Sequence, residues 1–315
     1  MIFGERLGKD AYRRIVWGPG RRVLGKFPST WEMKTMRATG RVMAGLLLSR
    51  RQQVKTNLRR AFPDRNDLDV IVDAAFATHF ANQYACFTFG KCTIDNWTDY
   101  IRFDGIDNLQ AAFSLGRGVV LMHPHMGPTQ LPLHVLGCIG WPMHQIGGGE
   151  ITRVELSQTG RWAAQQRTGH ERVMPVTIHD GKRFIRPVVR ALQSGAVMMT
   201  ACDGTGGGTE IGRRVPRQVL SQPMLLPTGP IALALMTNAP LLTIHCYLNP
   251  DPGCMYVAEI GGPIEFERQQ SKEVAIRTGL DASAEFLNRV LGVHPGDWLF
   301  WDGFAPGGLI IEETT

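Results

Sequence analysis

The segment at residues 118–140, GVVLMHPHMGPTQLPLHVLGCIG, restricts the fold more than any other part of the chain. Its apolar run at 119–122 has the length and composition of a buried strand, and the HPHMGP sequence that follows is typical of a tight turn. Residues 131–136 then show the apolar pattern of a helix. In open α/β sheets, ligands bind at such strand ends, and the start of the next helix offers N–H groups to an anion. His125 lies at this junction.

The rest of the chain repeats this alternation of strand-like and helix-like segments. Strands are expected at residues 100–103, 119–122, 141–146, 172–176, 196–202, 240–247 and 255–260. Helices are expected at residues 52–62, 68–89, 107–116, 150–166, 182–193, 225–237 and 272–291. The alternation predicts an α/β fold, with a mixed, largely parallel central sheet flanked by helices. The glycine-rich run at 204–208 predicts a mobile loop.

The N-terminal part of the chain is strongly basic. The formal net charge of the whole chain is +6, and Lys and Arg residues crowd the first 65 positions, between short apolar clusters. We therefore divide the chain into a basic N-terminal helical region, 1–65, and an α/β domain, 66–315. The basic helices suit an anionic partner such as a membrane surface or an acidic carrier protein. Helices that simply pack against the main domain remain an equal alternative. The sequence carries no nucleic-acid-binding signature, and we expect no nucleic acid partner.

The apolar runs and the cysteines indicate the cellular compartment of the protein. The longest apolar run, 42–48, is far shorter than the roughly 20 residues of a membrane-spanning helix, and nothing at the N-terminus has the pattern of a signal peptide. The six cysteines show no CxxC or metal-finger spacing. We therefore expect a reduced, cytoplasmic protein that is either soluble or peripheral on a membrane.

His125 and Gln130 are the first candidates for chemistry. If the turn and the first helical turn bring them together, the amide oxygen of Gln130 can accept a hydrogen bond from one imidazole nitrogen. The other nitrogen is then free to take a proton from an attacking hydroxyl. A lone histidine is more often structural, so spacing alone leaves both interpretations open.

Asp203 is the second candidate, because it follows the apolar strand at 196–202 and opens the glycine-rich run. An ordinary turn aspartate would occupy the same place. The glycine run matches neither a Walker motif nor GxGxxG, and the chain has no GxSxG sequence for a serine nucleophile. His123 and His125 form a His-x-His pair without an indicated third ligand, so we expect no metal and no cofactor.

Several blocks together resemble the lysophospholipid acyltransferase superfamily, in the branch of the lipid A late acyltransferases and the mycobacterial phosphatidylinositol mannoside acyltransferases. The blocks are VKTNLRRAFP at 54–63, the HxxxxQ turn at 125–130, Asp203-Gly204, LPTGPIALA at 226–234 and HPGDWLFW at 294–301. They are similar, in order, to the family's NL…AFP block, its HFGNWE turn, its strand-end aspartate, its PTGPARLA block and its closing tryptophan segment. Each block alone is weak, whereas their order and spacing are fairly specific.

The resemblance implies a glycerol-3-phosphate acyltransferase-like fold and an active site with a fatty-acyl tunnel. It implies transfer of a fatty acyl group from an acyl carrier protein or acyl-CoA thioester to a hydroxyl, or an amine, of a lipid or glycolipid acceptor. The 66–315 region would then be the acyltransferase domain. By position, His125 would be the general base, and backbone N–H groups near Gly127 would stabilise the oxyanion. Arg161 or Arg167 would bind phosphates of either substrate, and Thr228 with Gly229 would shape the site.

One position departs from the family pattern. The motif ends in Asp or Glu, and here it ends in Gln130. A carboxylate fixes the imidazole tautomer and also stabilises the imidazolium, whereas an amide can do only the first. Asp203 could supply the missing charge, or the acceptor could be a better nucleophile such as an amine. The remaining alternative is a catalytically degenerate member that binds an acyl chain or carrier protein.

Overall fold

The computed structural model describes residues 7–147, 156–180, 185–204, 213–265 and 271–312. These residues form a central seven-stranded sheet with the strand order β1-β9-β8-β2-β5-β3-β4. The strands are β1 (Ile101–Asp104), β2 (Val119–His123), β3 (Met143–Gly147), β4 (Thr177–Asp180), β5 (Val197–Ala201), β8 (Leu241–Leu248) and β9 (Tyr256–Pro263). Every neighbouring pair is parallel except β8 and β9, which are antiparallel. The predicted α/β fold with a mixed, largely parallel sheet is confirmed.

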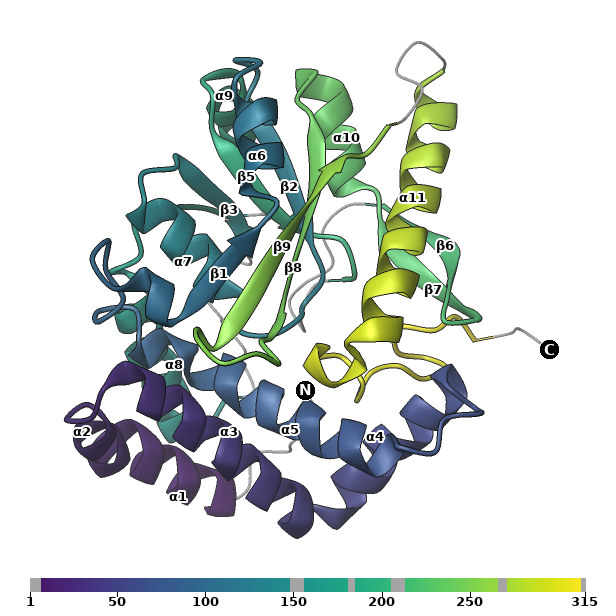
Figure 1. The fold of residues 1–315 in the computed structure, drawn as a ribbon. Coiled ribbons are helices and arrows are strands. Elements are labelled where there is room, and N and C mark those ends of the chain that lie inside the picture. Colours follow the sequence, from purple (N-terminus) through teal and green to yellow (C-terminus); the bar gives the residue numbers. More distant parts are fainter. Residues whose placement is uncertain (1–6, 148–155, 181–184, 205–212, 266–270, 313–315) are drawn as a thin grey trace.

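Helices cover both faces of this sheet, because the buried strands alternate their side chains between two apolar cores. On β2, Val120 and Met122 belong to one core, and Val119 and Leu121 to the other. The first core is closed by helices α9 (Arg186–Gln193), α10 (Gly229–Thr237) and α11 (Lys272–Val293). The second is closed by α6 (Ile106–Phe113) and α7 (Gln130–Cys138). Figure 1 shows α7 and α11 on opposite sides of the strands.

The N-terminal helices lie together along one end of the molecule (Figure 1). They are α1 (Leu7–Ile15), α2 (Arg21–Leu24), α3 (Ser29–Leu46), α4 (Leu48–Ala61) and α5 (Leu68–Tyr84), and α8 (Gln158–Glu171) packs against α1. Helix α3 packs closely on α5, since a Cβ at Gly40 would lie 2.5 Å from the carbonyl oxygen of Phe76. Helix α4 is tied to the C-terminal segment by the Asn57 side chain, which donates to the Trp301 carbonyl at 2.8 Å. Across the described residues, no helix combines the length and apolar character needed to cross a membrane.

Two local expectations were wrong. Residues 172–176 do not form a strand: α8 runs to Glu171, and β4 begins only at Thr177. Residues 225–227 belong to a strand and not to the start of a helix, because β7 (Gln222–Pro227) pairs with β6 (Arg214–Val219) in a separate antiparallel hairpin. The helix begins after them, at Gly229. Most of the predicted loop at 204–208 lies outside the described residues.

Candidate active site

The register of the sheet brings His125 and Asp203 together. Strands β2 and β5 are parallel neighbours, and their last paired residues are His123 and Ala201. His125 and Asp203 each follow two positions later, so the two chains leave the sheet side by side. The His125 ring nitrogen Nδ1 lies 2.7 Å from Oδ1 of Asp203, and the backbone N–H of His125 donates to Oδ2 at 2.7 Å. The two candidates therefore form one unit.

The chemistry of this pair fixes the tautomer of the imidazole. A carboxylate accepts hydrogen bonds and cannot donate, so in the neutral imidazole of His125 the proton lies on Nδ1 and the lone pair on Nε2. The Asp203 side chain is fully buried, whereas 21% of the His125 side chain is exposed. Burial alone would raise the pKa of Asp203, but the His125 ring and the hydrogen bonds from His125 and Trp298 outweigh it and lower that pKa. Asp203 thus stays ionised beside a partly accessible imidazole.

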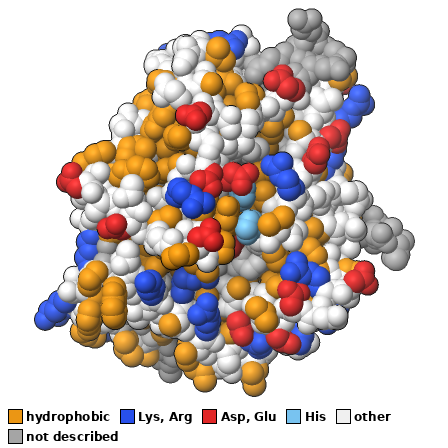
Figure 2. All heavy atoms as spheres, in the orientation of Figure 1, with side chains coloured by type: hydrophobic (Ala, Val, Ile, Leu, Met, Phe, Trp, Pro, Cys, Tyr) orange, Lys and Arg blue, Asp and Glu red, His pale blue; other side chains and the backbone are white. Residues whose placement is uncertain are grey.

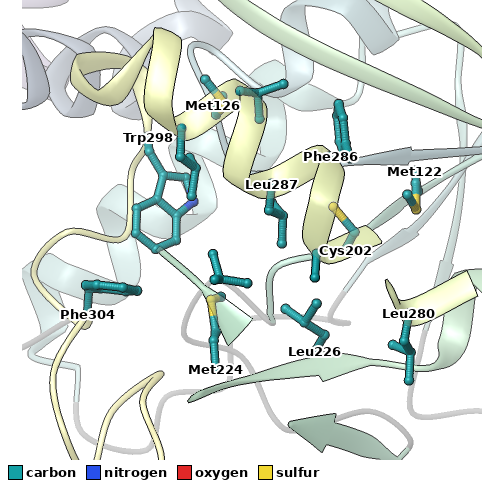
Figure 3. Close-up of a cluster of buried hydrophobic side chains, with 14 of the residues drawn as sticks. Met122, Met126, Cys202, Met224, Leu226, Leu280, Phe286, Leu287, Trp298 and Phe304 are labelled. Atoms are coloured by element: carbon teal, nitrogen blue, oxygen red, sulfur yellow. The ribbon is translucent and has the colours of Figure 1, made fainter. Parts of the chain in front are cut away.

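Trp298 and Phe300 complete the surroundings of this pair. The indole Nε1 of Trp298 donates to Oδ2 of Asp203 at 2.8 Å, and the indole itself packs in the apolar cluster with Met126 and Leu287. Figure 3 shows this cluster between α11 and the hairpin strands. The Phe300 ring lies over the His125 ring with a centroid distance of 4.5 Å. The backbone N–H of Leu299 donates to the His125 carbonyl at 2.9 Å. Residues 298–300 therefore hold both members of the pair in place.

His123, the other histidine of the motif, has a structural setting. Its side chain is buried, and Nδ1 lies 3.0 Å from the Pro124 carbonyl oxygen, to which it donates. Burial, helped by the neighbouring His125, lowers its pKa to about 4. It is thus neutral at ordinary pH. Within the described part of the chain, no cluster of three metal-type side chains includes this pair.

Gly127 shapes the turn after His125. Its φ of +59° lies in the left-handed region, and a Cβ there would lie 2.8 Å from the Cys246 carbonyl oxygen, so only glycine fits. Its N–H donates to the Asp297 carbonyl at 2.8 Å. Of the backbone N–H groups near Gly127 that the resemblance assigns to the oxyanion, that of Gly127 itself is therefore already engaged in this conformation.

Gln130 begins α7, but the imidazole partner is Asp203. Among the hydrogen bonds of the described residues, both ring and backbone donors of His125 go to Asp203, and none joins His125 to Gln130. The expected meeting of these two side chains is therefore absent from the described contacts. A carboxylate nevertheless contacts the imidazole, supplied by a residue 78 positions away.

The remaining candidates lie apart from this pair in their described contacts. On α8, Arg161 is exposed and donates to the Leu156 carbonyl at 2.7 Å, and Arg167 pairs with Glu171 at 2.7 Å. Thr228 directly precedes α10, and both its N–H and its hydroxyl donate to the Arg213 carbonyl, at 3.0 and 3.1 Å. Gly229 follows it as the first residue of that helix. No hydrogen bond of the described residues joins any of the four to His125 or Asp203.

The space beneath the turn is too small for an acyl chain. A cavity of about 10 Å³ lies there, and its lining includes His123, Met126, Thr129, His245 and Cys246. Such a volume holds at most about one water molecule. The fatty-acyl tunnel that the resemblance implies is therefore not formed by this cavity.

The sequence pointed to His125 and Asp203 but not to the residues that support them. Asp297, Trp298 and Phe300 were recognised only as part of the block at 294–301, with no role assigned. The signal was present, because a cluster of aromatic residues beside an aspartate, close to the C-terminus of a long helix, is unusual on a solvated surface.

Comparison with known proteins supports the same family. Residues 19–301, most of the chain, match the family of bacterial lipid A biosynthesis acyltransferases. No individual curated protein matches the sequence.

Proposed function

Because the chain belongs to the family of bacterial lipid A biosynthesis acyltransferases, an acyltransferase family of lipid biosynthesis, we propose that it uses His125 as a general base. The donor is a fatty acyl thioester of acyl carrier protein or coenzyme A. The acceptor is a hydroxyl, or an amine, of a glycolipid or related lipid. Residues 66–315 carry this chemistry, and the basic region 1–65 faces the anionic partner, on the cytoplasmic face of the inner membrane.

In the first step, the hydroxyl oxygen or amine nitrogen of the acceptor attacks the thioester carbonyl carbon. Nε2 of His125 takes the proton that this group loses. The proton on Nδ1 stays in its hydrogen bond to Asp203, so the imidazolium forms next to a buried negative charge. That charge stabilises the imidazolium and fixes the ring orientation. The carbonyl oxygen becomes the tetrahedral oxyanion.

In the second step, the tetrahedral intermediate collapses. The carbonyl double bond re-forms, the carbon–sulfur bond breaks, and the departing thiolate takes the proton from Nε2 of His125. The imidazole is then neutral again, and the acyl group is an ester or amide of the acceptor. Phe300 covers one face of the ring throughout, which keeps water from part of the reacting region.

One observation carries this proposal: the 2.7 Å contact between Nδ1 of a partly exposed histidine and the carboxylate of a fully buried aspartate. The same contact argues against the alternative of a degenerate, acyl-binding member, which rested on Gln130. The carboxylate that position 130 lacks is present at Asp203.

Release of free thiol from palmitoyl-CoA and from palmitoyl carrier protein, with and without a crude lipid extract, tests the proposal. We expect thiol release that His125→Ala lowers by about 10²–10⁴-fold. Asp203→Asn should lower it by about 10⁴-fold, as an acid-to-amide change does in the serine-protease triad. The matched control His79→Ala, which removes an exposed histidine of α5, should keep the wild-type rate.

Mass spectrometry of the extract then identifies the acylated acceptor. Full activity of His125→Ala would refute the general-base role. Tight binding of the acyl donor without any thiol release from wild type would support the degenerate alternative instead.

A further inference from the structure

Helix α3 has one solvent-exposed face with an unusual composition. Its exposed residues recur at helical spacing, and they are Trp31, Lys34, Thr35, Ala38, Arg41, Val42, Gly45 and Leu46. The large apolar side chains of this face, Trp31, Val42 and Leu46, are 61–69% exposed. A helix face of a soluble protein normally carries polar residues where it meets water. This face is apolar, and its only charges are two cations.

Acidic residues are almost absent from the surrounding sequence. Between Asp10 and Asp64 the chain contains a single acidic residue, Glu32. Its side chain is buried and paired with Lys91 at 2.8 Å. Among the described residues, neither Lys34 nor Arg41 forms an ion pair with a carboxylate. Their positive charge is therefore directed to the solvent.

The flanking segments extend the same surface. Val23 and Phe27 precede α3 and Leu48 follows it, and about half or more of each side chain is exposed. Two exposed cations lie in the same segment: Arg22 precedes Val23, and Lys26 precedes Phe27. In Figure 2, hydrophobic and basic side chains alternate along the lower-left edge, where Figure 1 places α2 and α3. We call this surface, formed by residues 22–48 of α2, α3 and the start of α4, the α3 face.

The fold prevents the α3 face from turning inward. The opposite side of α3 is locked on α5 by the close contact at Gly40 and by buried Arg37, whose Nη1 donates to the Thr78 hydroxyl at 3.2 Å. The exposed apolar side chains therefore have no place in the protein's own core. They are a fixed feature of the folded surface.

We propose that the α3 face docks on the surface of an anionic lipid bilayer. Tryptophan and leucine side chains enter the boundary between headgroups and acyl chains, while Lys34 and Arg41 contact lipid phosphates. An acidic carrier protein would use the cations, but it would leave the large apolar side chains in water. The apolar content therefore favours the bilayer. Docking goes beyond the acyl-transfer chemistry and places the protein where lipid acceptors reside.

Sedimentation with vesicles tests this proposal on the chain of 315 residues. The probes are phosphatidylcholine vesicles with and without phosphatidylglycerol, at low and high salt. Wild type should bind the anionic vesicles, and salt should weaken the binding. The double variant Trp31→Ser/Leu46→Ser should lower the partition coefficient at least tenfold. Lys34→Gln/Arg41→Gln should lower it by about fivefold for each cation removed.

Two substitutions serve as matched controls: Leu115→Ser, just after α6, removes an exposed apolar side chain, and Lys272→Gln, at the start of α11, removes an exposed cation. Figure 1 shows α6 and the start of α11 at the end of the molecule opposite α2 and α3. Both should bind as wild type does. Wild type that stays in the supernatant, or apolar and cation variants that bind unchanged, would overturn the proposal. Binding of acyl carrier protein is measured in parallel. If Lys34→Gln/Arg41→Gln weakened that binding and left vesicle binding unchanged, the proposal would also be overturned. Because vesicle binding needs neither a thioester nor His125, these outcomes leave the acyl-transfer proposal to its own test.

Discussion

At the scale of single residues, Asp203 is the centre of the candidate site. Its two carboxylate oxygens accept three hydrogen bonds, from the ring and backbone of His125 and from the indole of Trp298. A fully buried carboxylate needs such donors to stay ionised. The indole bond touches Asp203 and not the reacting atoms, so Trp298 is a positioning residue.

Trp298→Phe removes this donor while keeping an aromatic ring in the apolar cluster. Asp203 then becomes more basic, because one of the hydrogen bonds that lower its pKa is lost. We expect the acid limb of the kcat/KM profile to move to higher pH, with little change in KM for the donor. Measuring the rate of thiol release from about pH 5 to about pH 9 checks the position of the acid limb.

The matched control is Trp301→Phe. This substitution also removes an indole N–H, but that N–H donates to the Pro295 carbonyl at 2.6 Å and not to Asp203. It should lose stability without moving the acid limb. An equal shift in both variants would mean that general loosening of the C-terminal segment, and not the bond to Asp203, sets the profile.

Gln130→Glu restores the family's acidic residue at the end of the motif. Because Asp203 already provides the carboxylate at Nδ1, a second acid is not needed there. We expect the rate of thiol release to stay within about tenfold of wild type. A gain of several orders of magnitude would instead show that position 130 limits the natural protein.

How far the sequence could predict the site depended on the range of each interaction. His125 and Asp203 were identified separately, because each directly follows an apolar run of strand length. Their contact across 78 positions needed the pairing of β2 with β5, which no local pattern encodes. Trp298 could not be connected to Asp203 for the same reason, since 95 positions separate them.

At the scale of secondary structure, Asp297 links three elements to the turn after His125. Its backbone carbonyl accepts a hydrogen bond from the Gly127 N–H. Its carboxylate accepts from the Thr78 hydroxyl of α5 at 3.1 Å and from the Leu248 N–H at the end of β8 at 3.3 Å. Arg37 of α3 joins this network through Thr78. Burial raises the pKa of Asp297, although Arg37 and these hydrogen bonds oppose the shift. The N-terminal helices are thus connected to the turn after His125 by buried polar groups.

Thr78→Val tests this connection with an almost isosteric change. It removes the buried hydroxyl that accepts from Arg37 and donates to Asp297, which should cost about 1–3 kcal/mol in the free energy of unfolding. Urea denaturation followed by circular dichroism measures the loss. Thr39→Val is the control, because the Thr39 hydroxyl donates to the Thr35 carbonyl within the same helix and not to the Asp297 network. Its stability should change by less than about 0.5 kcal/mol; equal losses in the two variants would argue against the network.

The elements themselves were predicted well where one pattern dominated. Strand β5 and helix α11 follow clear apolar patterns and were placed within about two residues at each end. The hairpin of β6 and β7 was missed, because the apolar run Met224, Leu225, Leu226 beside an apolar helix has no period of its own. Likewise, sequence alternation cannot reveal that β9 runs antiparallel to β8.

At the scale of the whole molecule, the histidines make the fold sensitive to acid. Burial is the first cause of a lowered pKa at His123, His134, His144, His170, His179, His245 and His294. For His123 and His245 the pKa falls to about 4, against about 6.5 in an unfolded chain. Between pH 6.5 and pH 4, these two histidines therefore bind protons in the unfolded state but remain neutral in the folded state. The stabilisation is complete above pH 6.5 and is lost as the pH falls towards 4.

We accordingly expect the free energy of unfolding to fall by about 2 kcal/mol for each of these two histidines between pH 6.5 and pH 5. The raised pKa of Asp297 acts in the opposite direction, because the folded state binds this proton at a higher pH than the unfolded state does. Urea unfolding at several pH values measures the slope. His245→Gln removes one titrating group and should flatten it, whereas Tyr247→Phe, which keeps the ring stacked on His245, should not. An unchanged slope in His245→Gln would mean that His245 accepts its proton in the folded protein, which its burial against Phe286 and His294 argues against.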